Sequence, residues 1–404
     1  MWTKLFLRPT LIKRVHLTCT CRSLFIMQLK TTEFESLFTE GLVGLADMFK
    51  KNQFELRIAG GAVRDLLSGK RPEDVDFATT ATPEEMKTMF QAEGVRMINN
   101  KGERHGTITA RLHEENFEVT TLRVDVVTDG RLDGTLYDYF QGYEDLKNNK
   151  VRFVGSASRR IQEDYLRILR YFRFYGRVAA EPGQHEQETL EAIRENGRGL
   201  CGISGERIWV ELKKMLVGNH AAHLLSLLYE LGLAPYTGLP ADGDVEEMKQ
   251  AWLRSQDLSP KPMTVLAGVL RKLEDVEKLD QRLKLSKEEK TLGIFLVKHR
   301  RDLLKGLDEH DQLKPYTDFI TDSRDPECQG KVLELLKYQG EKDLVEELSR
   351  WSMPRFPVSG HDLRRLGYTS GKEIGSTLQE LRDVWKKSRY QMSKEELLAN
   401  LSTS

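Results

Sequence analysis

The sequence has few cysteines and no long apolar run. Its 404 residues include only four cysteines, and no two of them are spaced as Cys-x-x-Cys. This excludes a disulfide scaffold and a zinc site held by thiolates. No stretch approaches the roughly 20 apolar residues that a membrane-spanning helix needs. Low-complexity tracts and fixed-period repeats are also missing. We therefore expect a soluble intracellular protein, and its length predicts several domains.

The chain also lacks net charge, because 62 basic residues balance 62 acidic ones. Residues 1–30, however, contain basic side chains and no acidic one. This composition is typical of a mitochondrial presequence, and a disordered basic tail is the alternative. We predict a presequence over residues 1–30 and a location in the mitochondrial matrix. Initiation at Met27 would give a second, cytosolic or nuclear pool. The rest of the chain is mildly acidic, so nucleic acid would have to contact a local patch.

The pattern of the sequence changes near residue 155. Before it, strand-like and helix-like segments alternate: strands at 54–59, 75–78, 107–112 and 117–123, and helices at 62–68 and 83–91. Thr82 is the expected cap of the last of these helices. After residue 156, apolar residues recur at helical spacing, as in the stripe from Tyr165 to Phe172. The predicted fold class is α+β, with a small mixed head followed by an all-helical remainder.

Two glycines, Gly60 and Gly61, separate the first predicted strand from the first predicted helix of the head. Residues without a Cβ let main-chain N–H groups approach an anion at a helix start. Arg64, one turn into the helix, adds a guanidinium that suits phosphate. A glycine pair alone is more often an ordinary turn.

Two aspartates, Asp74 and Asp76, follow within the same short region. On a strand, residues two apart place both carboxylates on one face. Paired carboxylates suit two Mg²⁺ ions that activate an attacking oxygen and stabilise a leaving phosphate. An acidic loop is the ordinary alternative. The closeness of the glycine pair, the arginine and the aspartates favours phosphate chemistry.

The run Gly60-Gly61-x-x-Arg64-Asp65, followed by Asp74-x-Asp76-Phe77-Ala78-Thr79, resembles the nucleotide-binding motif of the class II tRNA nucleotidyltransferases. These CCA-adding enzymes are grouped with bacterial poly(A) polymerases in the polymerase β superfamily. The resemblance covers nearly the whole chain after residue 30 and is greatest to vertebrate mitochondrial members. It implies a polymerase β-like nucleotidyltransferase head with a mixed sheet and helices, then a helical neck, body and tail that hold tRNA. The implied bounds are 31–154 (head), 155–219 (neck), 220–320 (body) and 321–404 (tail).

The resemblance implies catalytic roles for three carboxylates of the head, Asp74, Asp76 and Glu118. The first two would hold the Mg²⁺ ions, and Gly60, Gly61 and Arg64 would bind the nucleotide. From the residues alone, Glu118 is an exposed strand residue with a solvated charge.

The run Glu163–Arg167, continuing through Arg170 and Arg173, carries alternating charges. Its spacing alone predicts a helix face laced by ion pairs. The resemblance implies instead that Asp164, Arg167, Arg170 and Arg173 bind the nucleotide. Asp164 and Arg167 would be the protein template for the incoming base.

The template chemistry follows from the hydrogen-bonding edges of the bases. Cytosine and adenine both present an amino donor beside a ring-nitrogen acceptor, which a carboxylate and a guanidinium match. Uracil and guanine reverse that pattern and would leave buried groups unpaired, at a cost of about 1–3 kcal/mol each.

Two further segments match the family. Residues 202–209 open a helix expected to support the template, with Ser204 as its N-cap. The run Trp385–Tyr390 is basic with aromatics, so Lys386, Lys387 and Arg389 are candidates for contact with the tRNA backbone. A solvated terminal helix is an equally compatible interpretation of that run.

One segment implied by the family is missing. After the strand that ends at Arg123, the resemblance implies an Arg-Arg-Asp-x-x-x-Asn motif that holds the ribose 2′-hydroxyl. Here Arg131 runs directly into Leu132, where the family pattern resumes. We predict a head that is destabilised, slow and poor at choosing ribonucleotides. Neighbouring strand edges would be exposed unless the sheet closes over the gap.

The predicted function is template-independent addition of CCA to tRNA 3′ ends from CTP and ATP, by two-metal phosphoryl transfer that releases pyrophosphate. One alternative is a tRNA-binding variant with impaired catalysis, because the segment is absent. Another is a poly(A) polymerase-like enzyme that uses ATP alone. Mg²⁺ is the expected cofactor and tRNA the expected partner, with no membrane. The sequence does not predict an oligomeric state.

Overall fold

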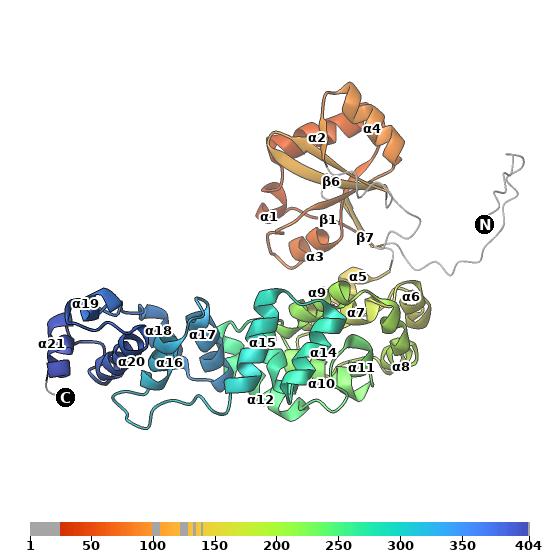
Figure 1. Cartoon of the computed structure of the whole chain (residues 1–404). Helices are drawn as coiled ribbons and strands as arrows, with labels where there is room; N and C mark the ends of the chain where they lie inside the picture. Colours follow the sequence, from red (N-terminus) through yellow and green to blue (C-terminus); the bar gives the residue numbers. More distant parts are fainter. Residues whose placement is uncertain (1–24, 99–105, 122–127, 132–134, 139, 403–404) are drawn as a thin grey trace, which may run out of the picture. The chain divides into compact units, whose positions relative to one another are not determined.

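The computed structural model of the chain describes residues 25–98, 106–121, 128–131, 135–138 and 140–402. The chain divides into two compact units, Met1–Lys150 and Val151–Ser404 (Figure 1). Most of the predicted presequence and Leu132, at the predicted junction, lie outside the described residues. Within the described part of the chain, no helix combines the length and apolarity that crossing a bilayer requires.

The first unit is built on one mixed sheet of eight strands in the order β1-β8-β7-β2-β3-β6-β5-β4. All neighbouring strands run antiparallel except β3 and β6, which run parallel. The strands are β1 (Phe25–Gln28), β2 (Leu56–Ala59), β3 (Asp76–Thr79), β4 (Arg96–Ile98), β5 (Thr107–Leu112), β6 (Glu115–Thr121), β7 (Thr128–Arg131) and β8 (Thr135–Asp138). The predicted mixed α/β head is confirmed.

Four helices share one apolar core with the sheet: α1 (Thr32–Glu35), α2 (Glu40–Lys51), α3 (Gly61–Leu67) and α4 (Pro83–Ala92). A fifth helix, α5 (Gly142–Lys147), follows β8 and has no buried residue. Phe49 of α2 and Phe90 of α4 meet edge to face, 5.9 Å between ring centroids, above the buried Ile58 and Val119 of the sheet. Thr82 caps α4 in a reciprocal capping box, as the sequence predicts.

The sheet closes beside the predicted junction. Strand β2 is paired on both sides, with β3 and with β7. Strands β7 and β8 form an antiparallel pair with Gly130 opposite Leu136, and Leu136 is fully buried. The expected exposed edge is therefore not found next to β2, because β7, the strand that ends at the junction, pairs with it.

The last residue of β8, Asp138, is a buried carboxylate with three main-chain partners. One oxygen accepts from the N–H groups of Phe140 and Gly142, at 3.2 and 2.9 Å, and the other accepts from Tyr143 at 2.9 Å. The bonds from Gly142 and Tyr143 satisfy donors in the first turn of α5 that have no partner within the helix, and the bond from Phe140 satisfies a donor just before it. The carboxylate thus fixes α5 to the end of the sheet.

The second unit is entirely helical in its described residues, as predicted. Its helices are α6 (Ala157–Glu163), α7 (Arg167–Val178), α8 (Gln187–Asn196), η2 (Gly197–Gly202), α9 (Gly205–Leu216), α10 (Ala221–Glu230), α11 (Ala234–Thr237), α12 (Val245–Ser255), η3 (Gln256–Leu258), α13 (Pro262–Leu266), η4 (Ala267–Val269), α14 (Leu273–Leu283), α15 (Lys287–His299), α16 (Lys314–Asp322), α17 (Cys328–Gln339), α18 (Lys342–Arg350), α19 (Gly360–Arg365), α20 (Gly371–Lys387), α21 (Lys394–Ala399) and η5 (Asn400–Ser402).

Two apolar cores organise this unit. The larger one extends from Ala157 to Leu348 and includes side chains of α6 to α18, so the predicted body–tail boundary at 320–321 falls inside it. The smaller one, between Val358 and Leu397, joins α19, α20 and α21. The packing therefore separates the last three α-helices from the rest, while the predicted bounds themselves stay predictions.

Strand β1 lies within the segment predicted as a presequence. Phe25–Gln28 pairs along its length with β8, and the next residue, Leu29, is buried. Removing residues 1–30 should therefore lower the melting temperature of the head relative to removing residues 1–24. The lost strand pairing and about 2 kcal/mol for the lost burial of the Leu29 side chain predict a fall of roughly 5–10 °C. Calorimetry of the two shortened chains measures the difference, and equal melting temperatures would show that β1 contributes nothing.

Candidate functional site

Gly60 joins β2 to α3 in a backbone conformation that favours glycine. Its φ is +68°, in the left-handed region. A Cβ placed on it would lie 3.6 Å from Oδ2 of Asp76, so the Asp76 carboxylate lies over the bare backbone of the turn. The turn and one of the two predicted metal-binding carboxylates are therefore neighbours in the structure.

The strand register places a second carboxylate beside the first. In the parallel pair β3–β6, Asp76 lies opposite Glu118, and strands in a sheet are about 4.8 Å apart. Both side chains are exposed, whereas the next residues along each strand, Phe77 and Val119, are buried in the core. One face of the sheet therefore holds the apolar core, and the opposite face carries Asp76 and Glu118.

Asp74 does not lie on the strand. Strand β3 begins at Asp76, and Asp74 forms part of a bend before it, so the prediction that both aspartates lie on a strand is wrong in that detail. Both are nevertheless exposed, while Val75 between them is half-buried. In the described ranges, no three Asp, Glu, His or Cys side chains converge closely enough to hold a metal ion by themselves.

Arg64 lies in the middle of α3, one turn after the glycine turn. Its Nε and Nη2 donate to Oδ1 of Asp65 at 2.9 and 2.7 Å, and Nη2 lies 3.5 Å from where a Cβ of Gly61 would be. About one fifth of each charged side chain is exposed. The guanidinium is therefore held near the turn, with donors left over for an incoming anion.

The chain bends at Asp164 between α6 and α7. Its φ and ψ are −154° and 104°, so the helix face predicted from the charge spacing of Glu163 to Arg167 is interrupted at this residue. Oδ1 of Asp164 accepts from the N–H of Leu166 at 3.2 Å, and its carbonyl accepts from the N–H of Arg167 at 2.9 Å. Asp164 thus caps the turn that starts α7.

The two predicted template residues have different partners. Nη1 of Arg167 donates to Oε2 of Glu163 at 2.5 Å and to the carbonyl of Arg160 at 2.9 Å. The hydrogen bond from Arg167 is the main cause that lowers the pKa of Glu163. Oδ2 of Asp164 instead accepts from Nη2 of Arg207 at 3.1 Å. The ion pair that spacing alone predicted, Glu163–Arg167, is present.

Arg170 and Arg173 share one buried carboxylate that the sequence did not single out. Their Nε atoms lie 3.3 and 3.2 Å from the two oxygens of Glu211 on α9, whose side chain is only 6% exposed. Glu211 directly precedes Leu212 in the buried stripe of α9. The position of Glu211, a charged residue on the apolar face of a predicted helix, is the sequence feature that could have indicated its role. Ser204 occupies the N-cap position of α9, but its hydroxyl makes no capping hydrogen bond.

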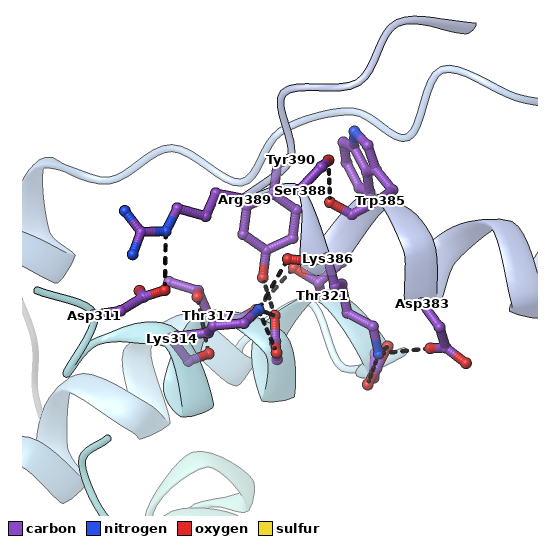
Figure 2. Close-up of polar contacts among 12 residues, drawn as sticks. Asp311, Lys314, Thr317, Thr321, Asp383, Trp385, Lys386, Ser388, Arg389 and Tyr390 are labelled. Atoms are coloured by element: carbon purple, nitrogen blue, oxygen red, sulfur yellow. Dashed lines mark hydrogen bonds and ion pairs between the residues drawn. The ribbon is translucent and has the colours of Figure 1, made fainter. Parts of the chain in front are cut away.

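Two of the three predicted RNA-contact residues of the tail make ion pairs within the chain (Figure 2). Nζ of Lys386 lies 2.8 Å from Asp322 and 3.0 Å from Asp383, and Nε of Arg389 lies 3.1 Å from Asp311. Burial lowers the pKa of Lys386, but its hydrogen bonds to the two aspartates outweigh that effect and raise it. Lys387 is exposed.

Tyr390 fastens the turn after α20 onto α16 (Figure 2). Its hydroxyl donates to Asp318 at 2.6 Å, and burial is the main cause that raises its pKa to about 12. Nζ of Lys314 donates both to Asp318 and to the carbonyl of Lys386, at 2.9 Å each. Arg389 and Tyr390 both have left-handed φ values, 56° and 62°, which cost non-glycine residues energy. These contacts hold a strained turn in place.

Comparison with known proteins gives matches along the whole chain. The family described as the poly A polymerase head domain matches residues 56–132. A second family, described as a probable RNA- and SrmB-binding site of polymerase A, matches residues 184–237. The first match ends next to the predicted junction.

Two curated relatives are similar over nearly their full length. The mitochondrial CCA tRNA nucleotidyltransferase 1 of Danio rerio is 78% identical over 431 positions, covering 100% of both chains. The Homo sapiens protein of the same name is 60% identical over 420 positions, covering 97% of each chain. Because this chain has 404 residues, about 27 positions of the first alignment have no residue here.

Two solved structures have the same fold. The Bacillus stearothermophilus CCA-adding enzyme in complex with CTP is 22% identical, with a TM-score of 0.66 over 93% of this chain and 99% of that chain. The Thermotoga maritima CCA-adding enzyme complexed with tRNA is 18% identical, with a TM-score of 0.66 over the same shares.

Replacing Tyr390 with Phe should loosen the turn between α20 and α21, because a hydrogen bond to a carboxylate contributes about 1.5–3 kcal/mol. Amide hydrogen exchange in the α20 and α21 peptides should then be about tenfold faster or more. Tyr368→Phe is the matched control, because the Tyr368 hydroxyl makes no hydrogen bond within the described chain. Equal exchange in the two variants would contradict a fastening role for Tyr390.

Proposed function

Because the chain belongs to the CCA tRNA nucleotidyltransferase family, we propose that it adds C, C and A in turn to the 3′ ends of tRNA, using CTP and ATP and releasing pyrophosphate. The observation that carries this proposal is the 78% identity with a mitochondrial CCA tRNA nucleotidyltransferase over the whole of both chains. The chain is thus a nucleotidyltransferase, and its substrates are a nucleoside triphosphate and the end of an RNA.

The named relatives are mitochondrial, and so is this protein. Within the organelle, the proposed place is the matrix, where tRNA is available. A chain initiated at Met27 would lack the first two residues of β1 and keep the buried Leu29. Such a chain is the proposed source of a cytosolic or nuclear pool.

The donors in the head suit Mg²⁺. Asp76 offers an exposed oxygen ligand next to a turn whose Gly60 has no side chain to obstruct a phosphate, and Asp74, two residues earlier, is also exposed. Mg²⁺ is usually held by one or two carboxylates together with phosphate oxygens, so a protein cluster of three is not required. Glu118, on the same face as Asp76, is the third carboxylate of the proposed site. When bound, Mg²⁺ neutralises phosphate charge and activates the attacking hydroxyl.

The residues of the head orient the reacting groups. The donors of Arg64 and the bare backbone at Gly60 and Gly61 receive the triphosphate. The tRNA 3′-hydroxyl oxygen forms a bond to the α-phosphorus as the bond to pyrophosphate breaks. Positioning and charge neutralisation account for most of the acceleration in phosphoryl transfer, so no side chain has to form a covalent intermediate.

The neck selects the base. Arg167 keeps donors free after its contacts with Glu163 and Arg160, and Asp164 keeps lone pairs free after its contacts with Leu166 and Arg207. A carboxylate acceptor and a guanidinium donor match the amino group and ring nitrogen of cytosine and adenine. The pair would therefore admit CTP and ATP and reject UTP and GTP.

The central test is nucleotide incorporation by the purified full chain into a tRNA transcript that lacks its 3′ CCA. With Mg²⁺, CTP and ATP, we expect addition of C, C and A. Asp74→Ala should lower the rate by about a hundredfold or more, the equivalent of several kcal/mol of lost charge stabilisation. Glu73→Ala, which removes the neighbouring exposed carboxylate, should change it little.

Other outcomes identify the alternatives. No addition by a chain that still binds the tRNA would make this protein a non-catalytic tRNA-binding form. Repeated addition of A from ATP alone would make it a poly(A)-adding enzyme. Each of these results contradicts the proposed CCA addition.

The missing segment should weaken discrimination against deoxynucleotides. The kcat/KM ratio of CTP to dCTP should rise about tenfold when the segment predicted to be missing, with its Arg-Arg-Asp-x-x-x-Asn motif, is inserted between Arg131 and Leu132, since one hydrogen bond to the 2′-hydroxyl is worth about 1.4 kcal/mol. Incorporation assays on the two chains measure the ratio. The same ratio and the same melting temperature in both would contradict a role for the segment.

A further inference from the structure

The carboxylate of Asp164 lies between two guanidinium groups. Its Oδ2 is 3.1 Å from Nη2 of Arg207 on α9 and 3.8 Å from Nη1 of Arg170 on α7. Only the first distance is a hydrogen bond. Its Oδ1 accepts from the N–H of Leu166. One side chain, Arg207, therefore sets the direction in which the second oxygen points.

The helix that carries Arg207 is fixed where it begins. A Cβ at Gly205, the first residue of α9, would lie 1.8 Å from the carbonyl oxygen of Arg282 at the end of α14. Nη2 of Arg282 also donates to the carbonyls of Leu200 and Ile203, at 3.0 Å each. The start of α9 is therefore closely packed against the end of α14, and Arg207 extends from the first turn of this packed helix.

The backbone next to Asp164 is also fixed. A Cβ at Gly199 in η2 would lie 2.0 Å from the ring of Tyr165, so that ring packs directly on the η2 backbone. Because the main chain is held in this way, the orientation of the Asp164 carboxylate can change mainly by rotation about χ2. This torsion is broad for aspartate, so its setting depends on the hydrogen-bonding partners.

The second guanidinium is directed elsewhere. Nε of Arg170 lies 3.3 Å from the buried carboxylate of Glu211, which also pairs with Arg173. Arg207 and Glu211 are four residues apart on α9, so they face α7 one turn from each other. Glu211 thus holds Arg170, while Arg207 holds Asp164. Without Arg207, Arg170 is the nearest cation toward which the Asp164 carboxylate can turn.

We propose that Arg207 is a positioning residue for nucleotide selection, which aims the Asp164 carboxylate so that a free lone pair of Oδ2 accepts the amino group of cytosine or adenine. This inference rests on the proposed function, in which Asp164 contacts the base. Arg207 does not touch the reacting atoms. Loss of Arg207 frees the Asp164 carboxylate to rotate toward Arg170. A misdirected carboxylate then no longer discriminates between a base that presents an amino group and a base that presents a carbonyl oxygen.

The test compares equilibrium binding of CTP and UTP to the full chain in Mg²⁺, by isothermal titration calorimetry. In the Arg207→Gln variant, the ratio of the UTP to the CTP dissociation constant should fall about tenfold, and Arg207→Lys should restore part of it. Arg198→Gln is the matched control, because Arg198 is an exposed arginine of the adjacent η2. It removes the same charge and should leave the ratio unchanged.

A second pair of variants separates positioning from a general structural effect. In a chain that already carries Asp164→Asn, adding Arg207→Gln should leave the ratio unchanged, because the group that Arg207 aims has lost its charge. Melting temperatures of all variants report on folding. A ratio unchanged by Arg207→Gln, or changed equally in the Asp164→Asn chain, would overturn the inference.

The binding assay also distinguishes this inference from the proposed function. A chain that prefers CTP over UTP, but adds no nucleotide to tRNA, contradicts only the catalytic proposal. A chain that binds CTP no better than UTP contradicts the inference itself, because Arg207 would then have no selectivity to set.

Discussion

The ion pairs between α7 and α9 hold the helical unit in the arrangement on which its proposed chemistry depends. Glu211 is nearly inaccessible, so its charge is tolerated only because Arg170 and Arg173 surround it. Removing one partner of a buried pair typically costs about 3–5 kcal/mol, since the remaining charge is left without solvent. An apolar residue at this position could stabilise the helices as well, but it would not direct two guanidinium groups. The network therefore contributes orientation as much as stability.

In the head, the sheet itself positions the charged side chains of the proposed site. Its sheet separates two environments by the alternation of side chains along each strand. Phe77 and Val119 join the core on one face, while Asp76 and Glu118 stand in solvent on the other. Like charges at one strand spacing repel each other, and that repulsion is relieved when cations are present. Packing on the apolar side of the sheet keeps Asp76 and Glu118 opposite each other on neighbouring strands.

Much of this architecture is readable in the sequence. The mixed head, the helical remainder, the capped α4 and the closeness of Gly60 to Asp76 all follow from local patterns. The break at Asp164 does not, because apolar residues on both sides keep helical spacing through it and hide the extended residue. Strand β1 is hidden by the basic composition of the chain around it. Asp322, one partner of Lys386, and Asp311, the partner of Arg389, lie more than 60 residues earlier in the chain, and no local pattern encodes such pairs.

The hydrogen bonds of the Asp138 carboxylate restrict which amino acids can occupy the positions that follow Asp138 in the chain. It accepts hydrogen bonds from the main chain of residues 140, 142 and 143, so those positions must each retain an amide hydrogen. None of these three hydrogen bonds uses a side-chain atom of the donor residue. Proline is therefore excluded at all three positions, because its ring nitrogen has no hydrogen to donate. The segment that leads out of the sheet is thus constrained by its main-chain amides at these three positions.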